Sequence, residues 1–418
     1  MSIISAHHVA SSTIKLALRR DTFWLFTPAT LIAHPPQASV ILPTLLVHYM
    51  TSTKKLLTRR LGAHGPEVSA IGLGTMGMTY RSTKDKILIE ALVIGIGAFY
   101  GKTDEAAAYR ALTYSADRGM TFWDCADVYG TTELTLGKWF AETGRRSEIF
   151  LATKFGSRDP EGKFGGGKPI SAPSYIKYAL ERSLKRLGTD YIDLYYQHRV
   201  DPKVPIEVVL ETLREPLEKG TIRWIGLSEC SVETLRRAKA VKGVGEKVVA
   251  AQMEFSPFTL DIEKNGFAEA AQKLGVAIVA YSPLGRGMIS GKYRSRADFE
   301  EGDFRLGLPR FSEENFPKNL ALADKIQAIA DKYKSTPSQV TLAWILATSN
   351  NYIPIPGCRS VERVEENSGG AEVQLGSEDI SAIRALSEAA DIQGERYAPI
   401  FMTYVEGNCI PLAEWKGE

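Results

Sequence analysis

The chain has 418 residues, 44% of them hydrophobic, which is ample for one large core or two smaller ones. Its 51 Lys and Arg nearly balance its 49 Asp and Glu, so the net charge of +2 gives no electrostatic reason to expect nucleic acid or an anionic membrane as a partner. No apolar run approaches the roughly 20 residues that span a bilayer, and the four cysteines lack metal-ligand or disulfide spacing, which favours a reducing, cytoplasmic location and no bound metal.

The first 49 residues differ in composition from the rest of the chain. They hold one acidic residue, Asp21, among several Ser, Thr and basic residues, and a Pro35-Pro36 pair. Such a leader is typical of an organellar transit peptide, whereas Met50, just before the first periodic segment, fits an over-extended reading frame, which we favour. Both interpretations predict that residues 1–49 are an N-terminal extension, disordered or not part of the fold, and that residues 50–418 form a single domain.

From residue 60 onward, short apolar runs recur, and most are followed by a helical pattern. Most runs are continuous rather than alternating, as expected of strands buried on both faces of a parallel sheet. The amphipathic stretches 103–119 and 172–188 end at Gly119 and Gly188, a helix-stop signal. Eight strands in β/α alternation predict an α/β fold, a closed (β/α)8 TIM barrel. In chain order the runs are VSAIGLGTM, TFWDCAD, IFLATKFG, YIDLYYQH, IRWIGLSE, VVAAQMEFS, VAIVAYSPLG and YIPIPG.

The first run contains Gly72-x-Gly74-x-x-Gly77, the spacing of a dinucleotide-binding Rossmann turn, and Glu90 lies near the place of its ribose-binding acid. A Rossmann turn needs the glycine loop to open directly into a helix. Here the polar stretch TMGMTYRSTKD follows, and no apolar helical period begins before about Lys86. We therefore expect the glycines to serve another purpose, and a Rossmann dehydrogenase is kept only as an alternative.

Chemically useful side chains follow three neighbouring strands. Asp124 lies near the end of the second run, Tyr129 in the loop after it, Lys154 within the third run and His198 at the end of the fourth. Because the catalytic groups of barrel enzymes come from these C-terminal strand ends, we expect the four side chains to meet. Each alone has an ordinary structural explanation, although a lysine in an apolar strand is rare without a partner.

These four groups suit acid–base chemistry at a carbonyl. A nearby ammonium favours the phenolate and so lowers the pKa of Tyr129, and the Asp124 carboxylate keeps Lys154 charged and oriented. A neutral His198 hydrogen-bonds a carbonyl oxygen and polarises it. The set predicts protonation of a carbonyl oxygen while hydride arrives at the carbonyl carbon.

From about Arg59 to about Tyr397 the sequence resembles the aldo-keto reductase superfamily, NAD(P)H-dependent enzymes on a (β/α)8 barrel. The four side chains fall on that family's catalytic tetrad, and RRLGAHGPEVSAIGLGTMGM and SPLGRG are similar to its NADPH-dependent, aldehyde-reducing branch. The resemblance implies that Tyr129 is the general acid. It also implies that Thr75 and Met76, in the opening GLGTMG, lie beside the cofactor.

The resemblance assigns further cofactor residues position by position. Ser228 and Gln252 match the ligands of the nicotinamide carboxamide, but Glu229 stands where the family has Asn. Tyr281 matches the aromatic residue that stacks on the nicotinamide and fixes which face delivers hydride. The other implied residues are Ser282, Leu284, Gly285 and Arg286 around the pyrophosphate and Gly357, Arg359, Arg363, Glu366 and Asn367 around the adenosine. Arg359 and Arg363 would face a 2′-phosphate, so the expected cofactor is NADPH (NADP+).

Residues 79–96 intervene between Met78 and Gly97, where the family's GTMGM runs almost directly into GAFYG. The part DKILIEALVIGI has helical periodicity and several apolar residues with no evident place to be buried. We interpret the segment as a retained intron or gene-model artefact, and a genuine lid is the competing hypothesis.

The sequence therefore predicts an enzyme that reduces an aldehyde or ketone to an alcohol with NADPH, and its expected partner is a small carbonyl substrate. A regulatory subunit that keeps the barrel and the bound nucleotide without significant turnover is the alternative from another class. Neither the physiological substrate nor an oligomeric state follows from the sequence.

Overall fold

The computed structural model describes residues 56–78 and 104–418, and all of them belong to one compact unit that spans Ser52–Glu418. The expected N-terminal extension, residues 1–49, and the inserted segment, residues 79–96, lie outside the described residues. The interpretations of both segments therefore stay predictions.

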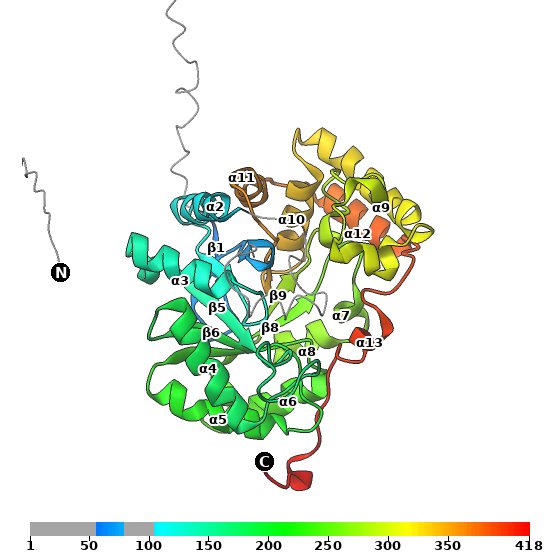
Figure 1. Ribbon diagram of the computed structural model, residues 1–418. Coiled ribbons are helices and arrows are strands. Elements are labelled where there is room, and N and C mark those ends of the chain that lie inside the picture. The colour runs from blue at the N-terminus through cyan, green and yellow to red at the C-terminus, as the bar shows by residue number, and fades with distance from the viewer. Residues whose placement is uncertain (1–55, 79–103) are drawn as a thin grey trace, which may run out of the picture. The chain divides into compact units, whose positions relative to one another are not determined.

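Eight parallel strands pair in the order β10-β9-β8-β7-β6-β5-β4-β3, each with its neighbour in the sequence. The two outer strands of this order also meet, because Gly74 bridges Gly357 in parallel and its N–H donates to the Pro356 carbonyl at 3.0 Å. The sheet is therefore closed, which confirms the predicted (β/α)8 barrel (Figure 1). The strands are β3 (Leu73–Gly74), β4 (Phe122–Asp124), β5 (Phe150–Phe155), β6 (Ile192–Gln197), β7 (Ile222–Ser228), β8 (Val248–Glu254), β9 (Ala277–Tyr281) and β10 (Tyr352–Pro354).

The seam between β3 and β10 gives the glycine motif a structural explanation. A Cβ on Gly72 would lie 2.8 Å from the Ile355 side chain, and one on Gly74 would lie 2.8 Å from the Ile355 carbonyl oxygen. After β3 the chain enters a short 3-10 helix, η1 (Met76–Met78), and not a helix that covers a Rossmann sheet. The Rossmann alternative is therefore wrong, and the glycines allow the close approach that closes the barrel.

An antiparallel hairpin, β1 (Thr58–Arg60) and β2 (Glu67–Ser69), precedes the barrel. Leu61 and Val68 of this hairpin share a buried cluster with Phe122 and Ala277, which are the first residues of β4 and β9. Because strands of the barrel run parallel, this contact places the hairpin at the N-terminal end, where it plugs the interior. The opposite, C-terminal end is left for a site.

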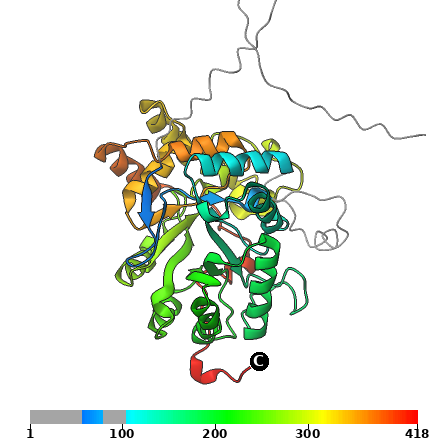
Figure 2. The ribbon, with the colours of Figure 1, turned by 90° about the vertical axis from the view of Figure 1, so that its left-hand side faces the viewer.

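Amphipathic helices surround the strands, and a large core of buried residues lies between the two layers (Figures 1 and 2). The predicted helix stops are confirmed, because Gly119 and Gly188 follow the ends of α2 and α4 with φ of 80° and 59°. The helices are α2 (Glu105–Asp117), α3 (Thr132–Thr143), α4 (Pro173–Leu187), α5 (Ile206–Glu218), α6 (Val232–Ala240), α7 (Asp261–Lys264), α8 (Phe267–Lys273), α9 (Asn315–Lys332), α10 (Pro337–Thr348), α11 (Val361–Gly369), α12 (Ser377–Ala389) and α13 (Pro399–Met402).

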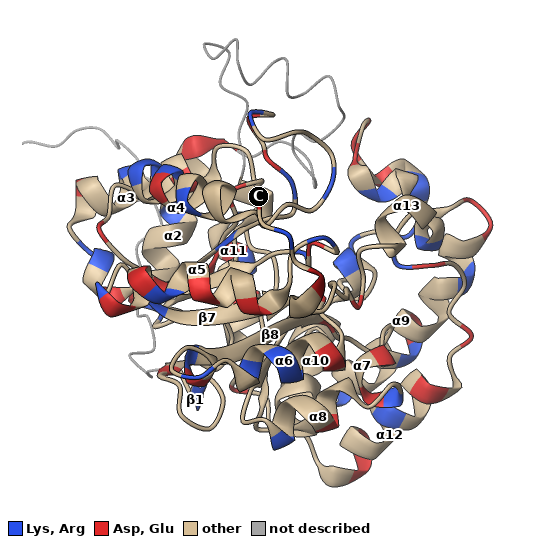
Figure 3. Ribbon diagram, turned by 90° about the horizontal axis from the view of Figure 1, so that it is seen from below, with Lys and Arg blue, Asp and Glu red and all other residues tan. Residues whose placement is uncertain are grey.

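Basic and acidic residues alternate over the outer helices rather than gathering by sign (Figure 3). This mixture agrees with the near-zero net charge of the whole sequence. Within residues 56–78 and 104–418, no helix is long and apolar enough to cross a membrane.

Candidate active site

Alternation along the barrel strands decides which side chains face the interior. Phe122, Ala152 and Tyr196 belong to the cluster inside the barrel. Asp124, Lys154 and His198 each follow one of them by two residues, so they share the inward face one step closer to the C-terminal end. The strand pattern therefore brings these three side chains together at the open rim.

Lys154 and Asp124 form a buried ion pair at the centre of this rim. The Lys154 ammonium donates to Asp124 Oδ1 at 2.5 Å and to the Cys125 carbonyl at 2.7 Å, and the Gln252 amide donates to Asp124 Oδ2 at 2.7 Å. The two charged side chains are 0% and 3% exposed. Burial raises the pKa of Asp124, and the hydrogen bonds from Lys154 and Gln252 oppose this rise. The carboxylate thus has donors on both oxygens, which a buried charge requires.

Tyr129 lies in the loop between β4 and α3, with its hydroxyl 3.5 Å from Lys154 Nζ. Its ring meets the ring of His198 edge to face, with the centroids 5.9 Å apart. Burial and the neighbouring Asp124 raise the pKa of Tyr129 well above its usual value. The predicted net fall in the pKa of Tyr129 is wrong, because burial has the largest effect on this pKa and raises it. Tyr129 is therefore a protonated phenol at neutral pH.

His198 follows β6 and is neutral. Burial lowers its pKa well below the usual value, and the nearby cations of Lys154, Arg199 and Arg158 lower it further. Its Nδ1 atom is buried and has no hydrogen-bond partner among the described residues. The neutral imidazole that the sequence predicted is thus the state that this environment favours.

Ser228 and Gln252, the two residues implied for a carboxamide, are direct neighbours on β7 and β8. Both are buried, and the Ser228 hydroxyl accepts a hydrogen bond from Arg199 at 3.4 Å. Thr75 also reaches this region, because its hydroxyl donates to the Asp124 carbonyl at 2.7 Å. Met76, the next residue, is partly buried against the main core.

Glu229 has a different environment from the one that a carboxamide ligand needs. Its side chain is fully buried and accepts hydrogen bonds from the Tyr281 hydroxyl at 2.7 Å and from the Glu254 N–H at 3.2 Å. Arg396, far along the chain, pairs with both carboxylate oxygens. The Glu in place of Asn therefore belongs to a charge network at the rim.

The segment after β9 turns sharply at the positions implied for the pyrophosphate. Ser282, Gly285 and Arg286 have left-handed φ values of 50°, 57° and 56°. Leu284, between them, packs against the main core. Arg286 donates to the Arg396 carbonyl at 2.8 Å and to Glu254 at 3.0 Å. These contacts hold the turn against the C-terminal segment.

The residues implied for the adenosine lie in the segment just before α11 and in α11 itself. Asn367 is buried, donates to Cys358 Sγ at 3.1 Å, and has a buried Oδ1 atom without a hydrogen-bond partner among the described residues. Arg363 forms an ion pair with Glu366, one turn further along α11. Gly357 is exposed next to the barrel seam, and Arg359 is partly buried two residues later.

Three residues of this rim were missed by sequence reasoning. Arg199 is next to His198, and its charge within YYQHRVD is a signal that was available. Arg396 and Tyr397 come from the segment after α12, and the Tyr397 hydroxyl lies 3.1 Å from that of Tyr281. No local pattern marks these two, because their neighbours at the rim are distant in the sequence.

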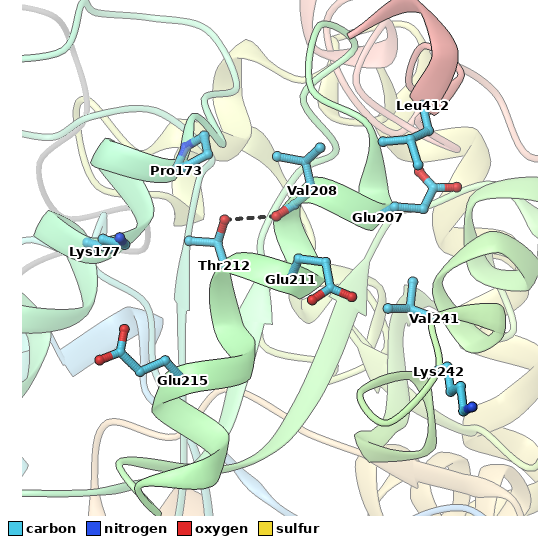
Figure 4. Close-up of a pocket in the computed structure, with 10 residues that line it drawn as sticks. All are labelled: Pro173, Lys177, Glu207, Val208, Glu211, Thr212, Glu215, Val241, Lys242 and Leu412. Atoms are coloured by element: carbon cyan, nitrogen blue, oxygen red, sulfur yellow. Dashed lines mark hydrogen bonds between the residues drawn. The ribbon is translucent and has the colours of Figure 1, made fainter. Parts of the chain in front are cut away.

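A separate groove of about 540 Å³ lies on the helix layer, and none of the expected site residues lines it (Figure 4). Figure 4 shows Lys177 of α4 opposite Glu211 and Glu215 of α5, with Leu412 from the C-terminal segment at one side. Over the described part of the chain, no group of His, Cys, Asp or Glu is arranged to hold a metal ion.

Known proteins are similar to this chain in sequence. The model of the Aldo/keto reductase family matches residues 91–388. Aldo-keto reductase str7 of Strobilurus tenacellus is 43% identical over 359 residues, which cover 85% of this chain and 99% of that protein. Aldo-keto reductase yakc (NADP(+)) of Schizosaccharomyces pombe is 45% identical over 347 residues, 82% of this chain and 94% of that protein.

A solved structure is similar as well. It is a thermostable aldo-keto reductase, Tm1743, in complex with the inhibitor epalrestat, and it is 28% identical with a TM-score of 0.58. The match covers 79% of this chain and 100% of that one. The chain belongs to the aldo/keto reductase family of NAD(P)H-dependent oxidoreductases.

Proposed function

We propose that the protein reduces aldehydes or ketones to alcohols with NADPH and that Tyr129 donates the proton. The observation that carries this proposal is the meeting of Tyr129, Lys154, Asp124 and His198 at the C-terminal rim. The rim supplies a protonated phenol, a cation and a neutral imidazole within one site. A small carbonyl compound is the substrate class that such a set serves.

Each side chain has a separate task in this proposal. Tyr129 holds a proton at its hydroxyl and transfers it to the carbonyl oxygen as negative charge develops there. Lys154, 3.5 Å from that hydroxyl, stabilises the phenolate that remains. Asp124 keeps Lys154 in place, and the neutral ring of His198 orients and polarises the carbonyl. Bound NADPH supplies the hydride for the carbonyl carbon.

Several features of the chain fit such a cofactor. Ser228 and Gln252 would hold the carboxamide, and the left-handed turn at Ser282, Gly285 and Arg286 would take the pyrophosphate. The buried, unpartnered Oδ1 atom of Asn367 fits an acceptor for a nucleotide N–H group. Further contacts with the cofactor are proposed for Thr75, Met76, Tyr281, Leu284, Gly357 and Glu366.

The choice of NADPH over NADH rests on two arginines, one just before α11 and one in its first turn. Arg359 and Arg363 present cations suited to a 2′-phosphate, and the relative yakc carries NADP(+) in its name. A cytoplasmic location is also proposed, and it is supported by the four cysteines, all of which are free thiols.

The test is a panel of aldehydes and ketones assayed by the loss of NADPH absorbance, with Tyr129→Phe as the deciding variant. Loss of the phenol proton should lower kcat by about 10²- to 10⁴-fold. The Kd for NADPH, measured by fluorescence titration, should change little because the aromatic ring is kept. A Tyr129→Phe variant with wild-type turnover would contradict the assigned role, and a wild type that binds NADPH without turning over any carbonyl would favour a regulatory subunit.

A further inference from the structure

Buried charges form a network on the β7–β9 side of the rim, away from Asp124 and Lys154. Two carboxylates, Glu229 and Glu254, meet the guanidinium groups of Arg286 and Arg396. All four side chains are 6% exposed or less. Such charges are costly to bury unless their geometry is kept, so the network constrains the elements that it joins.

Glu229 is the centre of this network. Its Oε1 atom accepts hydrogen bonds from Tyr281, Glu254 N–H and Arg396 at 2.7, 3.2 and 3.3 Å. Its backbone has a φ of 49°, an uncommon conformation for a residue with a side chain. Despite burial, the cations of Arg396 and Arg199 lower its pKa, so the side chain is a carboxylate at neutral pH.

The same residue also fastens the C-terminal segment to the barrel. The Gly407 N–H donates to the Glu229 carbonyl at 2.8 Å, and Cys230 and Gly407 form a parallel bridge. Ten residues earlier in this segment, Tyr397 contacts two members of the rim. Its hydroxyl lies 3.1 Å from the Tyr281 hydroxyl, and its ring lies 4.2 Å below the Arg286 guanidinium. The C-terminal segment therefore contacts the chain at the ends of β7 and β9, beside the positions implied for the cofactor.

We infer that Glu229 is a positioning residue for the cofactor, which fixes Tyr281 through its hydroxyl and clamps the C-terminal segment through Arg396. This inference rests on the proposed function, since Tyr281 is the residue assigned to the nicotinamide ring. Glu229 itself does not take the carboxamide role of the family's Asn, because its oxygens already accept from Tyr281, Glu254 and Arg396.

Two variants distinguish an electrostatic effect on NADPH binding from a positioning effect, because they change the net charge in opposite directions. Glu229→Gln removes a negative charge and makes the net charge of the rim more positive by one, whereas Arg396→Gln removes a positive charge and makes it more negative by one. If these residues acted only by attracting the cofactor phosphates, the two variants would shift the Kd for NADPH in opposite directions. As positioning partners they should both raise it, each by about tenfold, which corresponds to the loss of one charged hydrogen bond. The double variant Glu229→Gln/Arg396→Gln should raise the Kd for NADPH by less than the product of the two single fold-changes.

Three measurements on the full chain test the inference: the Kd for NADPH by fluorescence titration, its dissociation rate by stopped flow, and the KM values. We expect the KM for NADPH to rise with the Kd, while the KM for the carbonyl substrate changes little. Tyr281→Phe, which removes one hydroxyl and keeps the ring, should also weaken binding, and it covers the case in which Glu229→Gln does not fold. Glu229→Asn should weaken binding as well, whereas tighter binding in this variant would assign the family's carboxamide role to position 229.

Asp193→Asn is the matched control. Asp193, in β6 near the other end of the barrel, is 4% exposed and pairs with Arg146 and Arg223 at 2.8 Å. It should lower the thermal midpoint without changing the Kd. An unchanged Kd in Glu229→Gln and Tyr281→Phe, with an active wild type that loses turnover in Tyr129→Phe, would overturn this inference and leave the proposed function standing. A wild type without affinity for NADPH would overturn both.

Discussion

At the level of single residues, the site is built around an ammonium group with no exposed surface. Lys154 contacts the Asp124 carboxylate, the Cys125 carbonyl and the Tyr129 hydroxyl, and together they replace the water that a cation loses on burial. A buried ion pair of this kind adds little net stability, but loss of one partner is costly. The pair therefore explains the fixed geometry of Tyr129 better than it explains the stability of the barrel.

A second buried cluster lies behind the same loop. Asp127, two residues before Tyr129, accepts hydrogen bonds from Arg182 at 2.7 Å and from Tyr175 at 3.3 Å, while its Oδ1 atom has no hydrogen-bond partner among the described residues. Burial, followed by the charge of Glu133, raises the pKa of Asp127 to about 7, against the opposing arginines. The groups that face it are Glu133 of α3, Arg158 of the loop after β5, Tyr175, Arg182 and Arg186 of α4, and Tyr195 of β6.

This cluster predicts a pH dependence of stability. Because the pKa of Asp127 is raised on folding, its contribution to stability is complete below about pH 4 and is lost as the pH rises through about 7. A rise of this size corresponds to about 4 kcal/mol at most. Asp127→Asn should therefore flatten the fall in the free energy of unfolding between pH 5 and 8, measured by urea denaturation. An equal slope in wild type and variant would show that Asp127 stays ionised throughout this range.

At the level of elements, the closure of the barrel depends on two short strands. β3 has two residues and β10 has three, so few hydrogen bonds join them. Their contact is close because Gly72 and Gly74 present no Cβ toward Ile355 and the carbonyl of Pro356. The glycines of the motif thus act on packing between strands, in the very segment that carries Thr75 and Met76.

A pair of substitutions tests this explanation. Gly74→Ala should lower the free energy of unfolding by about 1–3 kcal/mol, because its Cβ would meet backbone atoms that are held by the seam. Gly77→Ala is the control, since a Cβ there meets no described atom within 4 Å. Urea denaturation of both variants gives the comparison. Equal stability of the two would refute the packing role of Gly74.

At the level of the whole molecule, the barrel separates stability from chemistry by its two ends. The β1–β2 hairpin fills the N-terminal end with Leu61 and Val68, while the charged and polar side chains gather at the C-terminal end. The arrangement is that of (β/α)8 enzymes in general, in which loops at the C-terminal face carry the function.

A chain that begins at Met50 should therefore fold like the full chain. We expect its thermal midpoint and its Kd for NADPH to equal those of the full-length protein, because residues 56–78 and 104–418 by themselves close the barrel and fill its N-terminal end. Differential scanning calorimetry and fluorescence titration of the two chains, prepared in parallel, provide the measurement. A lower midpoint for the shorter chain would show that residues 1–49 contribute to the fold.

The sequence by itself determined the strand order, the barrel and the four residues at its rim. These features follow from local patterns: the apolar runs mark the strands, and the positions of Asp124, Lys154 and His198 toward the ends of successive runs predict that they meet at the C-terminal rim. The family resemblance then assigned Ser228 and Gln252, which the structure places on adjacent strands.

Only the tertiary structure decided the role of Glu229, the direction of the Tyr129 pKa and the purpose of the glycine motif. Each depends on atoms that are far apart in the chain: Arg396 pairs with Glu229, burial in the packed site raises the pKa of Tyr129, and Gly74 meets the backbone after β10. Burial and distance across a closed sheet are properties of the packed chain, and no local pattern in the sequence records them.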